Sequence, residues 1–134
     1  MMRLEAAAIY IGLNIILLLI LAYLVSAARR RHKIALGDGG NAAMHRAIRA
    51  HANAAEFIPA GLVGILALAL LEPAAPLWLL HASGISLTGG RIAHGVGLSM
   101  GTLNAGRMVG TLLSWIAYLL IGGGLLYAGL SGRL

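Results

Sequence analysis

The stretch Arg46-Ala-Ile-Arg49-Ala-His-Ala-Asn53-Ala-Ala-Glu56-Phe-Ile-Pro59 decides how this chain folds. Most of its residues are apolar, and Arg46, Arg49, Asn53 and Glu56 follow one another at spacings of three, four and three. At about 100° per residue, these four side chains fall within roughly 80° of one another on a helix. Ionisable groups in a membrane helix are costly and face a cavity or a partner. The stretch therefore predicts a membrane helix that carries a candidate site.

The composition of the whole chain agrees with a membrane location. Apolar residues make up 60% of the 134 residues and charged residues only 10%, whereas soluble domains have about 45–50% and about 25%. The length predicts one domain, residues 1–134. The absence of cysteine excludes disulfides, cysteine-bound metal and a protein thiol nucleophile. The net charge of +6 does not indicate nucleic acid, because the basic residues gather at predicted membrane boundaries with few aromatic residues among them.

Four hydrophobic segments approach the ~20 residues that cross a bilayer. They run from about Leu4 to Ala28, His45 to Leu71, Ala74 to Leu98 and Arg107 to Leu130. Lipid offers the backbone no hydrogen bonds, so each segment is expected to be helical. The expected fold class is therefore all-α, an integral membrane four-helix bundle, with short connections at Glu72–Pro76 and Ser99–Gly106.

The first segment has a second interpretation. Val25-Ser26-Ala27 resembles a signal-peptidase site. The length of the apolar stretch, Glu5 near its start and the arginines directly after it argue against cleavage.

Basic residues in the loops predict the orientation. The first loop holds Arg29, Arg30, Arg31 and Lys33, and the third ends at Arg107, whereas the second has no lysine or arginine. The first and third loops are therefore expected to be cytoplasmic and both termini outside. The Arg29–Lys33 run is interpreted as a topology and lipid-headgroup signal.

This orientation brings the polar residues of three helices to one side of the membrane. Arg46 starts the second helix, Arg91 and His94 share a face of the third, and Arg107 starts the fourth, where the helix dipole also favours an anion. The prediction is a cationic pocket with one carboxylate, suited to a small anionic or zwitterionic ligand. The five histidines offer no pair spaced by three or four residues, so no metal or haem site is predicted.

These motifs resemble those of the membrane-associated proteins in eicosanoid and glutathione metabolism, the MAPEG family. The pattern Arg-x-x-Arg-x-x-x-Asn-x-x-Glu-x-x-Pro at 46–59 looks like the family signature. Gly90-Arg91-Ile-Ala-His94 is similar to the third helix of microsomal prostaglandin E synthase, and Arg107 falls where the family carries its catalytic arginine. The compact length resembles a bacterial member, which implies the inner membrane.

The resemblance implies a homotrimer that holds glutathione, the co-substrate, between neighbouring subunits. It implies that Arg107 stabilises the glutathione thiolate and that Glu56 holds the α-amino group. The remaining glutathione-binding residues that it implies are Arg46, Arg49, Asn53, Arg91 and His94. The implied enzyme is a transferase or peroxidase that conjugates glutathione to lipophilic electrophiles or reduces lipid peroxides. The chain differs from the prostaglandin synthase at Ala52, Leu98 and Met108, where that enzyme has arginine, tyrosine and serine.

Other interpretations of the same residues remain open. Glu56 with Arg49 or Arg91 could be a buried ion pair that fixes helix packing, and Arg107 could be an ordinary boundary cation. A small multidrug-type transporter also has four helices and a membrane carboxylate, although arginines beside Glu56 disfavour cation transport. The third alternative is a non-catalytic membrane scaffold.

Overall fold

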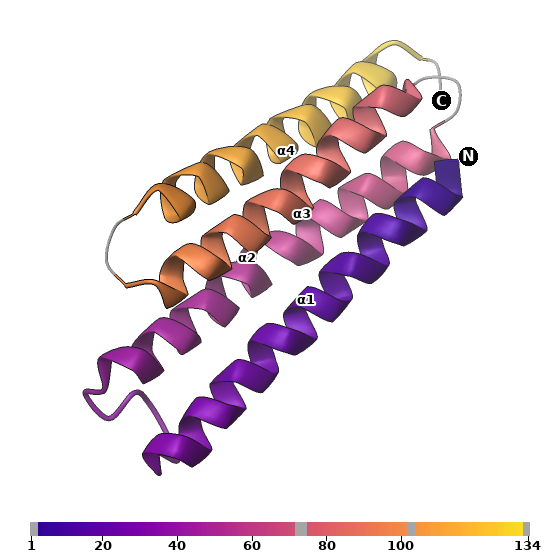
Figure 1. Ribbon diagram of the computed structural model, residues 1–134. Helices are drawn as coiled ribbons and strands as arrows, with labels where there is room; N and C mark the ends of the chain where they lie inside the picture. The colour runs from indigo at the N-terminus through magenta and orange to yellow at the C-terminus, as the bar shows by residue number, and fades with distance from the viewer. Residues whose placement is uncertain (1–2, 72–74, 102–103, 133–134) are drawn as a thin grey trace.

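Four antiparallel helices make up the structure, a computed structural model that describes residues 3–71, 75–101 and 104–132 (Figure 1). In chain order the helices are α1 Arg3–His32, α2 Ala42–Leu70, α3 Leu77–Ser99 and α4 Ala105–Leu130. The α1–α2 and α3–α4 connections lie at one end of the bundle, and the two ends of the chain lie at the other (Figure 1). The predicted all-α four-helix bundle is confirmed. The predicted connections at Glu72–Pro76 and Ser99–Gly106 lie partly outside the described residues.

Local capping sets the helix boundaries at the end that carries the basic residues. Asn41 Oδ1 accepts a 3.0 Å hydrogen bond from the Met44 N–H, and Asn104 Oδ1 accepts one of 3.1 Å from the Arg107 N–H. Both are N-cap contacts, so α2 and α4 begin slightly before their predicted starts. Conversely, α1 runs past its predicted end at Ala28 through the basic cluster, because positive charge in the last turn complements the helix dipole.

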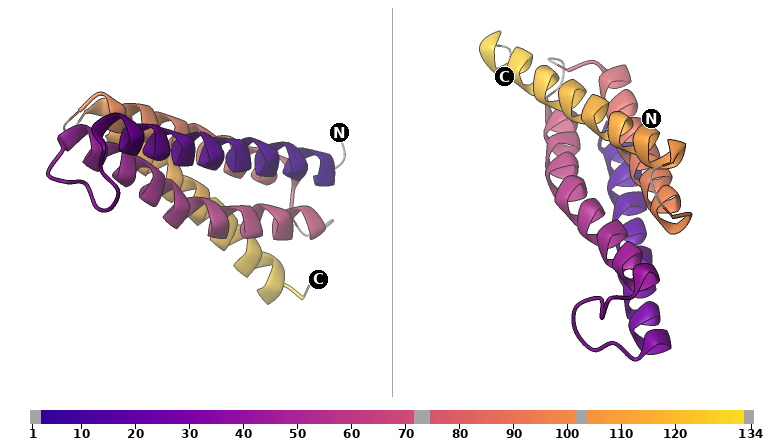
Figure 2. Two further views of the ribbon diagram at one scale, coloured as in Figure 1. Left: turned by 90° about the horizontal axis from the view of Figure 1, so that it is seen from below. Right: turned by 90° about the vertical axis from the view of Figure 1, so that its left-hand side faces the viewer.

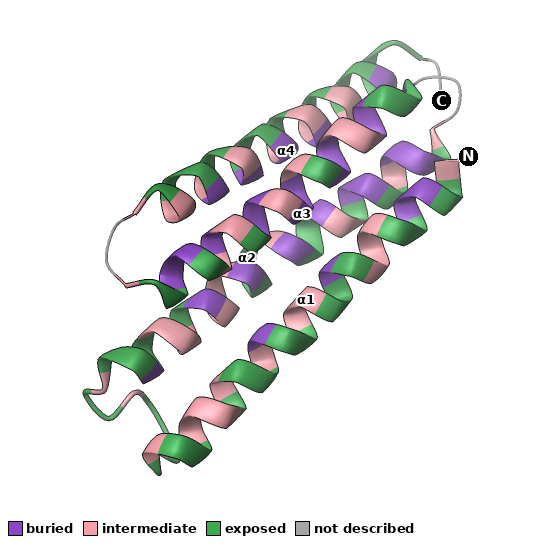
Figure 3. Cartoon of the chain, viewed as in Figure 1, coloured by how far each residue is buried: buried purple, intermediate pink, exposed green. Residues whose placement is uncertain are grey.

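Three of the four helices, α1, α2 and α4, are long and apolar enough to cross a membrane. The sequence predicts four such segments, but α3 is less apolar because it carries buried Ser83, Thr88, Arg91 and His94. With 23 residues, α3 is about 35 Å long and runs beside the other helices (Figures 1 and 2). It also has the largest share of buried residues (Figure 3). Polar residues lie on the enclosed helix because lipid contact would be costly for them.

The helices pack unequally around α3. It contacts all three other helices and lies closest along α4, whereas α1 and α4 make no contact with each other among the described residues. Asn14, which is fully buried in α1, donates a 2.8 Å hydrogen bond to Thr88 Oγ1 of α3. Asn14 therefore links α1 to α3 inside the bundle. The lipid-accessible surface of α1 is almost continuously apolar, as expected of a helix at the periphery of the bundle.

Candidate functional site

A cavity of about 540 Å³ opens at the end of the bundle where the basic residues gather. Arg46, Arg49 and Asn53 of α2 line one side of it, and Arg107 of α4 and His94 of α3 line the other. Five of the seven residues predicted from the sequence therefore meet in one space within a single chain. The imidazole of His94 is close enough to three guanidinium groups for their charges to act on it: Arg49, Arg91 and Arg107.

Close packing of α3 against α4 places Arg107 in this cavity. A Cβ added to Gly97 would lie 2.6 Å from the backbone nitrogen of Arg107, and one added to Gly110 would lie 2.5 Å from the backbone nitrogen of His94. Only glycine allows the two backbones to approach this closely. Gly97, Gly106 and Gly110 thus permit the close approach of α3 and α4, whereas a Cβ added to Gly101, at φ +116°, would meet nothing within 4 Å.

The Arg107 side chain is suited to hold an anion. Arg107 lies in the first turn of α4, where the helix dipole gives the helix end a partial positive charge, and its own backbone N–H is capped by Asn104. Its Nε is buried and has no hydrogen-bond partner among the described residues. A buried guanidinium nitrogen without a partner is uncommon in native proteins, and its ordinary explanations include a catalytic role and a bound water or ion.

Arg91 lies behind the cavity and does not line it. Arg91 is 1% exposed, and its guanidinium donates from Nε to Ser114 Oγ at 2.9 Å and from Nη2 to the Gly110 carbonyl at 3.1 Å. Its Nη1 donates to Asn53 Oδ1 at 2.5 Å, and its Cζ lies 4.6 Å from the centre of the Phe57 ring. Arg91 therefore joins α2, α3 and α4 and fixes the amide of Asn53 at the cavity wall.

The structure does not place Glu56 in the pocket where the sequence predicted it. Its side chain is exposed on the outer surface of α2 and does not line the cavity. Among the described residues it makes no ion pair with Arg49 or Arg91. Its charge nevertheless acts on the buried Arg91 guanidinium, so Glu56 lies at the exposed edge of the polar stripe.

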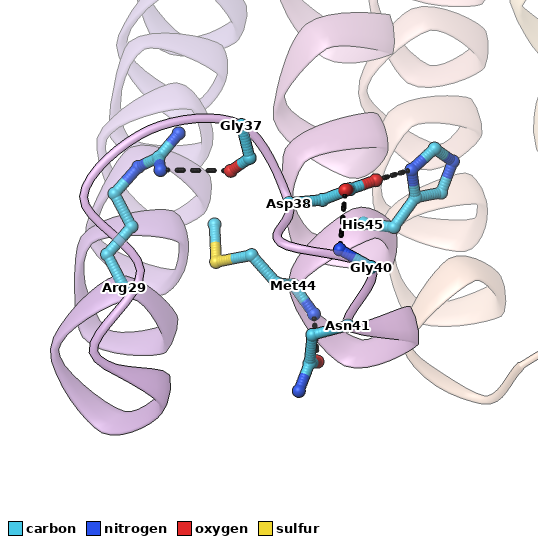
Figure 4. A network of polar contacts seen from close by, with 7 residues as sticks. All are labelled: Arg29, Gly37, Asp38, Gly40, Asn41, Met44 and His45. Atoms are coloured by element: carbon cyan, nitrogen blue, oxygen red, sulfur yellow. Dashed lines mark hydrogen bonds and ion pairs between the residues drawn. The ribbon is translucent and has the colours of Figure 1, made fainter.

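A short loop before α2 supplies part of the cavity wall, which the sequence analysis did not predict. Figure 4 shows the polar contacts of this loop. Asp38 Oδ1 accepts a 3.0 Å bond from the Gly40 N–H, and Asp38 Oδ2 lies 2.7 Å from His45 Nδ1. The Gly40 N–H and then the His45 imidazole hold the pKa of the Asp38 carboxyl below its usual value. Asp38 thereby places one carboxylate in an otherwise cationic lining. The signal for this loop was Gly37-Asp-Gly-Gly-Asn41, which predicts a turn but no cavity.

The comparisons with known proteins agree with this arrangement. The sequence profile of the MAPEG family matches residues 7–127. The chain belongs to the MAPEG family. It is also similar to inner membrane protein YecN of Escherichia coli strain K12 and of an O6:H1 strain, each 36% identical over 115 residues that cover 86% of this chain and 86% of the relative. Together with its apolar helices, this makes the chain an integral inner membrane protein.

In this MAPEG protein the cavity wall is apolar at Leu98, where the prostaglandin synthase has a phenol. Tyr118 does not replace that phenol, because its hydroxyl donates a 2.6 Å bond to the Phe57 carbonyl and its ring packs 5.5 Å from the Phe57 ring. The described residues that line the cavity include no tyrosine.

Proposed function

We propose that this MAPEG protein is a glutathione-dependent membrane enzyme that activates the glutathione thiol with Arg107. The observation that carries the proposal is the partnerless, buried Arg107 Nε at the wall of a cavity rich in arginine. Glutathione carries two carboxylates and a thiol, and guanidinium groups bind carboxylates in two-point geometry. Arg46 and Arg49 take these carboxylates, and Asn53 and His94 supply further polar contacts.

The chemistry follows from the charge of Arg107. A free thiol has a pKa of about 8.5, and a nearby cation lowers it, so that the nucleophilic thiolate exists at neutral pH. In conjugation, the thiolate sulfur forms a bond to an electrophilic carbon, and the leaving group or opened ring takes the electron pair. In peroxide reduction, two glutathione thiols supply two electrons, the O–O bond breaks, and the products are an alcohol, water and glutathione disulfide.

A homotrimer with glutathione between neighbouring subunits is part of the proposal. Glu56 lies 14 residues from the start of α2, about 21 Å along the helix axis, and is exposed on its outer surface. A charged side chain near the centre of the bilayer costs about 2.5–3.5 kcal/mol by insertion scales. A second copy of the chain that covers this surface removes that cost and brings Glu56 beside a neighbouring cavity, where it can hold the α-amino group.

The direct test is glutathione binding by the purified protein in detergent. Millimolar glutathione is expected to raise the melting temperature, and the ultraviolet absorbance of the thiolate is expected to appear at neutral pH. In Arg107→Ala the thiolate fraction should fall to that of the free thiol, about a few per cent. Arg30→Ala, which removes an exposed arginine outside the cavity, should retain both signals. No thermal shift in the unmodified protein would contradict the proposal.

A further inference from the structure

A second cavity, of about 430 Å³, lies between α1, α2 and α3 at the same end of the bundle. Most of its lining is apolar or small, including Leu21 and Leu24 of α1, Ala47 and Ala50 of α2, and Gly95 of α3. Leu24 is half exposed on the outer surface of the bundle, so the cavity is continuous with the surface that faces lipid. We call this cavity the α1–α2 groove.

The α1–α2 groove is cationic at one end and apolar at the other. Arg31 and His32 belong to the last turn of α1, and Arg46 to the start of α2. None of the described residues that line the groove is acidic. Leu21 lies ten residues before Arg31, about 15 Å deeper along the helix axis. The groove thus has the polarity of an amphiphile, with a site for a negative group at the membrane boundary and an apolar channel below it.

We infer that the α1–α2 groove binds an anionic membrane lipid. The lipid phosphate lies between Arg31 and Arg46, and an acyl chain lies along Leu21, Leu24, Ala47 and Gly95. An arginine close to an anionic headgroup strengthens such binding through its charge. A free phosphate would use the two arginines but would leave the apolar part of the groove unfilled, so the shape and charge together favour the lipid.

A second copy of this chain fits the groove less well. The chain has four acidic residues, and a protein segment that complements Arg31 and Arg46 would have to present one of them at this end. Glu5 lies in the first turn of α1, at the opposite end, and Glu56 and Glu72 come later in α2 or after it. Asp38 is engaged with His45 and Gly40. Charge complementarity therefore favours a lipid as the occupant.

Arg46 lines both the first cavity and the groove. A variant of Arg46 would change both sites, so it cannot distinguish them. Arg31 lines only the groove, and its neighbour Arg30 is held over the Tyr23 ring with its Cζ 5.8 Å from the ring centre. Arg30 does not line the groove, which makes Arg31 and Arg30 a matched pair for an experiment.

The test measures which lipids stay with the purified full-length protein. After exchange into mixed micelles with equal amounts of phosphatidylglycerol and phosphatidylcholine, native mass spectrometry should find phosphatidylglycerol retained in preference. Arg31→Gln should lower this retention about fivefold, the factor that about 1 kcal/mol represents, and Arg30→Gln should leave it unchanged.

The apolar channel is tested by variants that fill it. Ala47→Leu should lower the retention of phosphatidylglycerol. Ala43→Leu, at an exposed lining residue, provides the same test if Ala47→Leu does not fold.

Several outcomes would overturn the inference. Equal loss of retention in Arg30→Gln and Arg31→Gln would indicate a diffuse basic surface. A melting-temperature increase with inorganic phosphate equal to that with phosphatidylglycerol would assign the site to free phosphate. If Ala47→Leu and Ala43→Leu changed the oligomeric state but not the lipid retention, the groove would be an interface between copies. None of these measurements involves glutathione, so they are independent of the proposed enzymatic function.

Discussion

The Nη1 of Arg91 donates a hydrogen bond to the Oδ1 of Asn53, so a buried guanidinium in α3 fixes the orientation of an amide at the cavity wall of α2. The same guanidinium bonds to Ser114 Oγ and the Gly110 carbonyl of α4. Through one side chain, three helices are held together directly beneath the candidate site. Arg91 therefore acts on the site by positioning Asn53, and it is not a ligand of the cavity itself.

Replacement of this side chain should cost stability. Arg91→Met keeps an apolar chain of similar reach but leaves Asn53 Oδ1 without its donor. We expect the free energy of unfolding to fall by about 1–3 kcal/mol, because the hydrogen bonds of a buried charged group are lost, measured by denaturant titration in detergent. The control Arg49→Met removes an arginine that lines the open cavity and should change the unfolding free energy little. Equal stability of the two variants would show that the Arg91 contacts contribute nothing measurable.

The sequence predicted those site residues that share a helix face through their spacing of three or four positions. Arg46, Arg49 and Asn53 recur on one face within an apolar segment, and Arg107 stands at the start of another, so their convergence followed from periodicity and the grouping of basic residues at one end. The four helices themselves were predicted because each apolar segment is long enough to cross a bilayer.

The remaining features depend on helix rotation and loop conformation, which spacing does not encode. Glu56 lies in the same polar stripe as Arg49, yet it faces outward because the rotation of α2 in the bundle is set by its packing. Asp38 enters the cavity lining through a loop in which Gly37, Gly39 and Gly40 have positive φ. Hydrophobic periodicity predicts neither the outward orientation of Glu56 nor the position of Asp38 in the cavity lining.

The glycines between α3 and α4 give a prediction about packing. In Gly97→Ala, the added methyl group would meet the Arg107 backbone at 2.6 Å, so the helices must move apart. We expect a loss of about 1–3 kcal/mol in unfolding free energy, as for other overpacked sites, together with weaker glutathione binding by titration calorimetry. Gly89→Ala is the matched control on the same helix, because its Cβ would meet nothing within 4 Å. It should gain about 0.5–1 kcal/mol from helix propensity. A neutral Gly97→Ala would contradict the role of this contact.

Asp38 gives a prediction about pH. The Gly40 N–H and His45 lower the pKa of its carboxyl in the folded state, so its contribution to loop stability is complete above the unfolded pKa of about 4. That contribution is lost as the pH falls through the lower folded pKa. The melting temperature of the unmodified protein should therefore fall more steeply in this acidic range than that of Asp38→Asn. Since the Gly40 N–H has the larger effect, His45→Gln should retain most of the dependence. Identical acid profiles for Asp38→Asn and the unmodified protein would show that the contact is irrelevant to stability.

The outer surface of α2 gives a prediction about assembly. Glu56 is exposed there, and Val63, two helical turns further along, is 70% exposed. If a second copy covers this surface, a single cysteine placed on it will lie near a neighbouring chain. The chain contains no cysteine, so Val63→Cys should form covalent oligomers with a bifunctional thiol cross-linker in membranes, visible by denaturing electrophoresis. Leu119→Cys, on the outer surface of α4 and 75% exposed, is the control and should remain monomeric, because α4 is expected to face lipid. Cross-linking at both positions, or at neither, would argue against an interface on this surface of α2. Glu56 would then have no neighbouring chain to cover its charge, although its position in the membrane requires one.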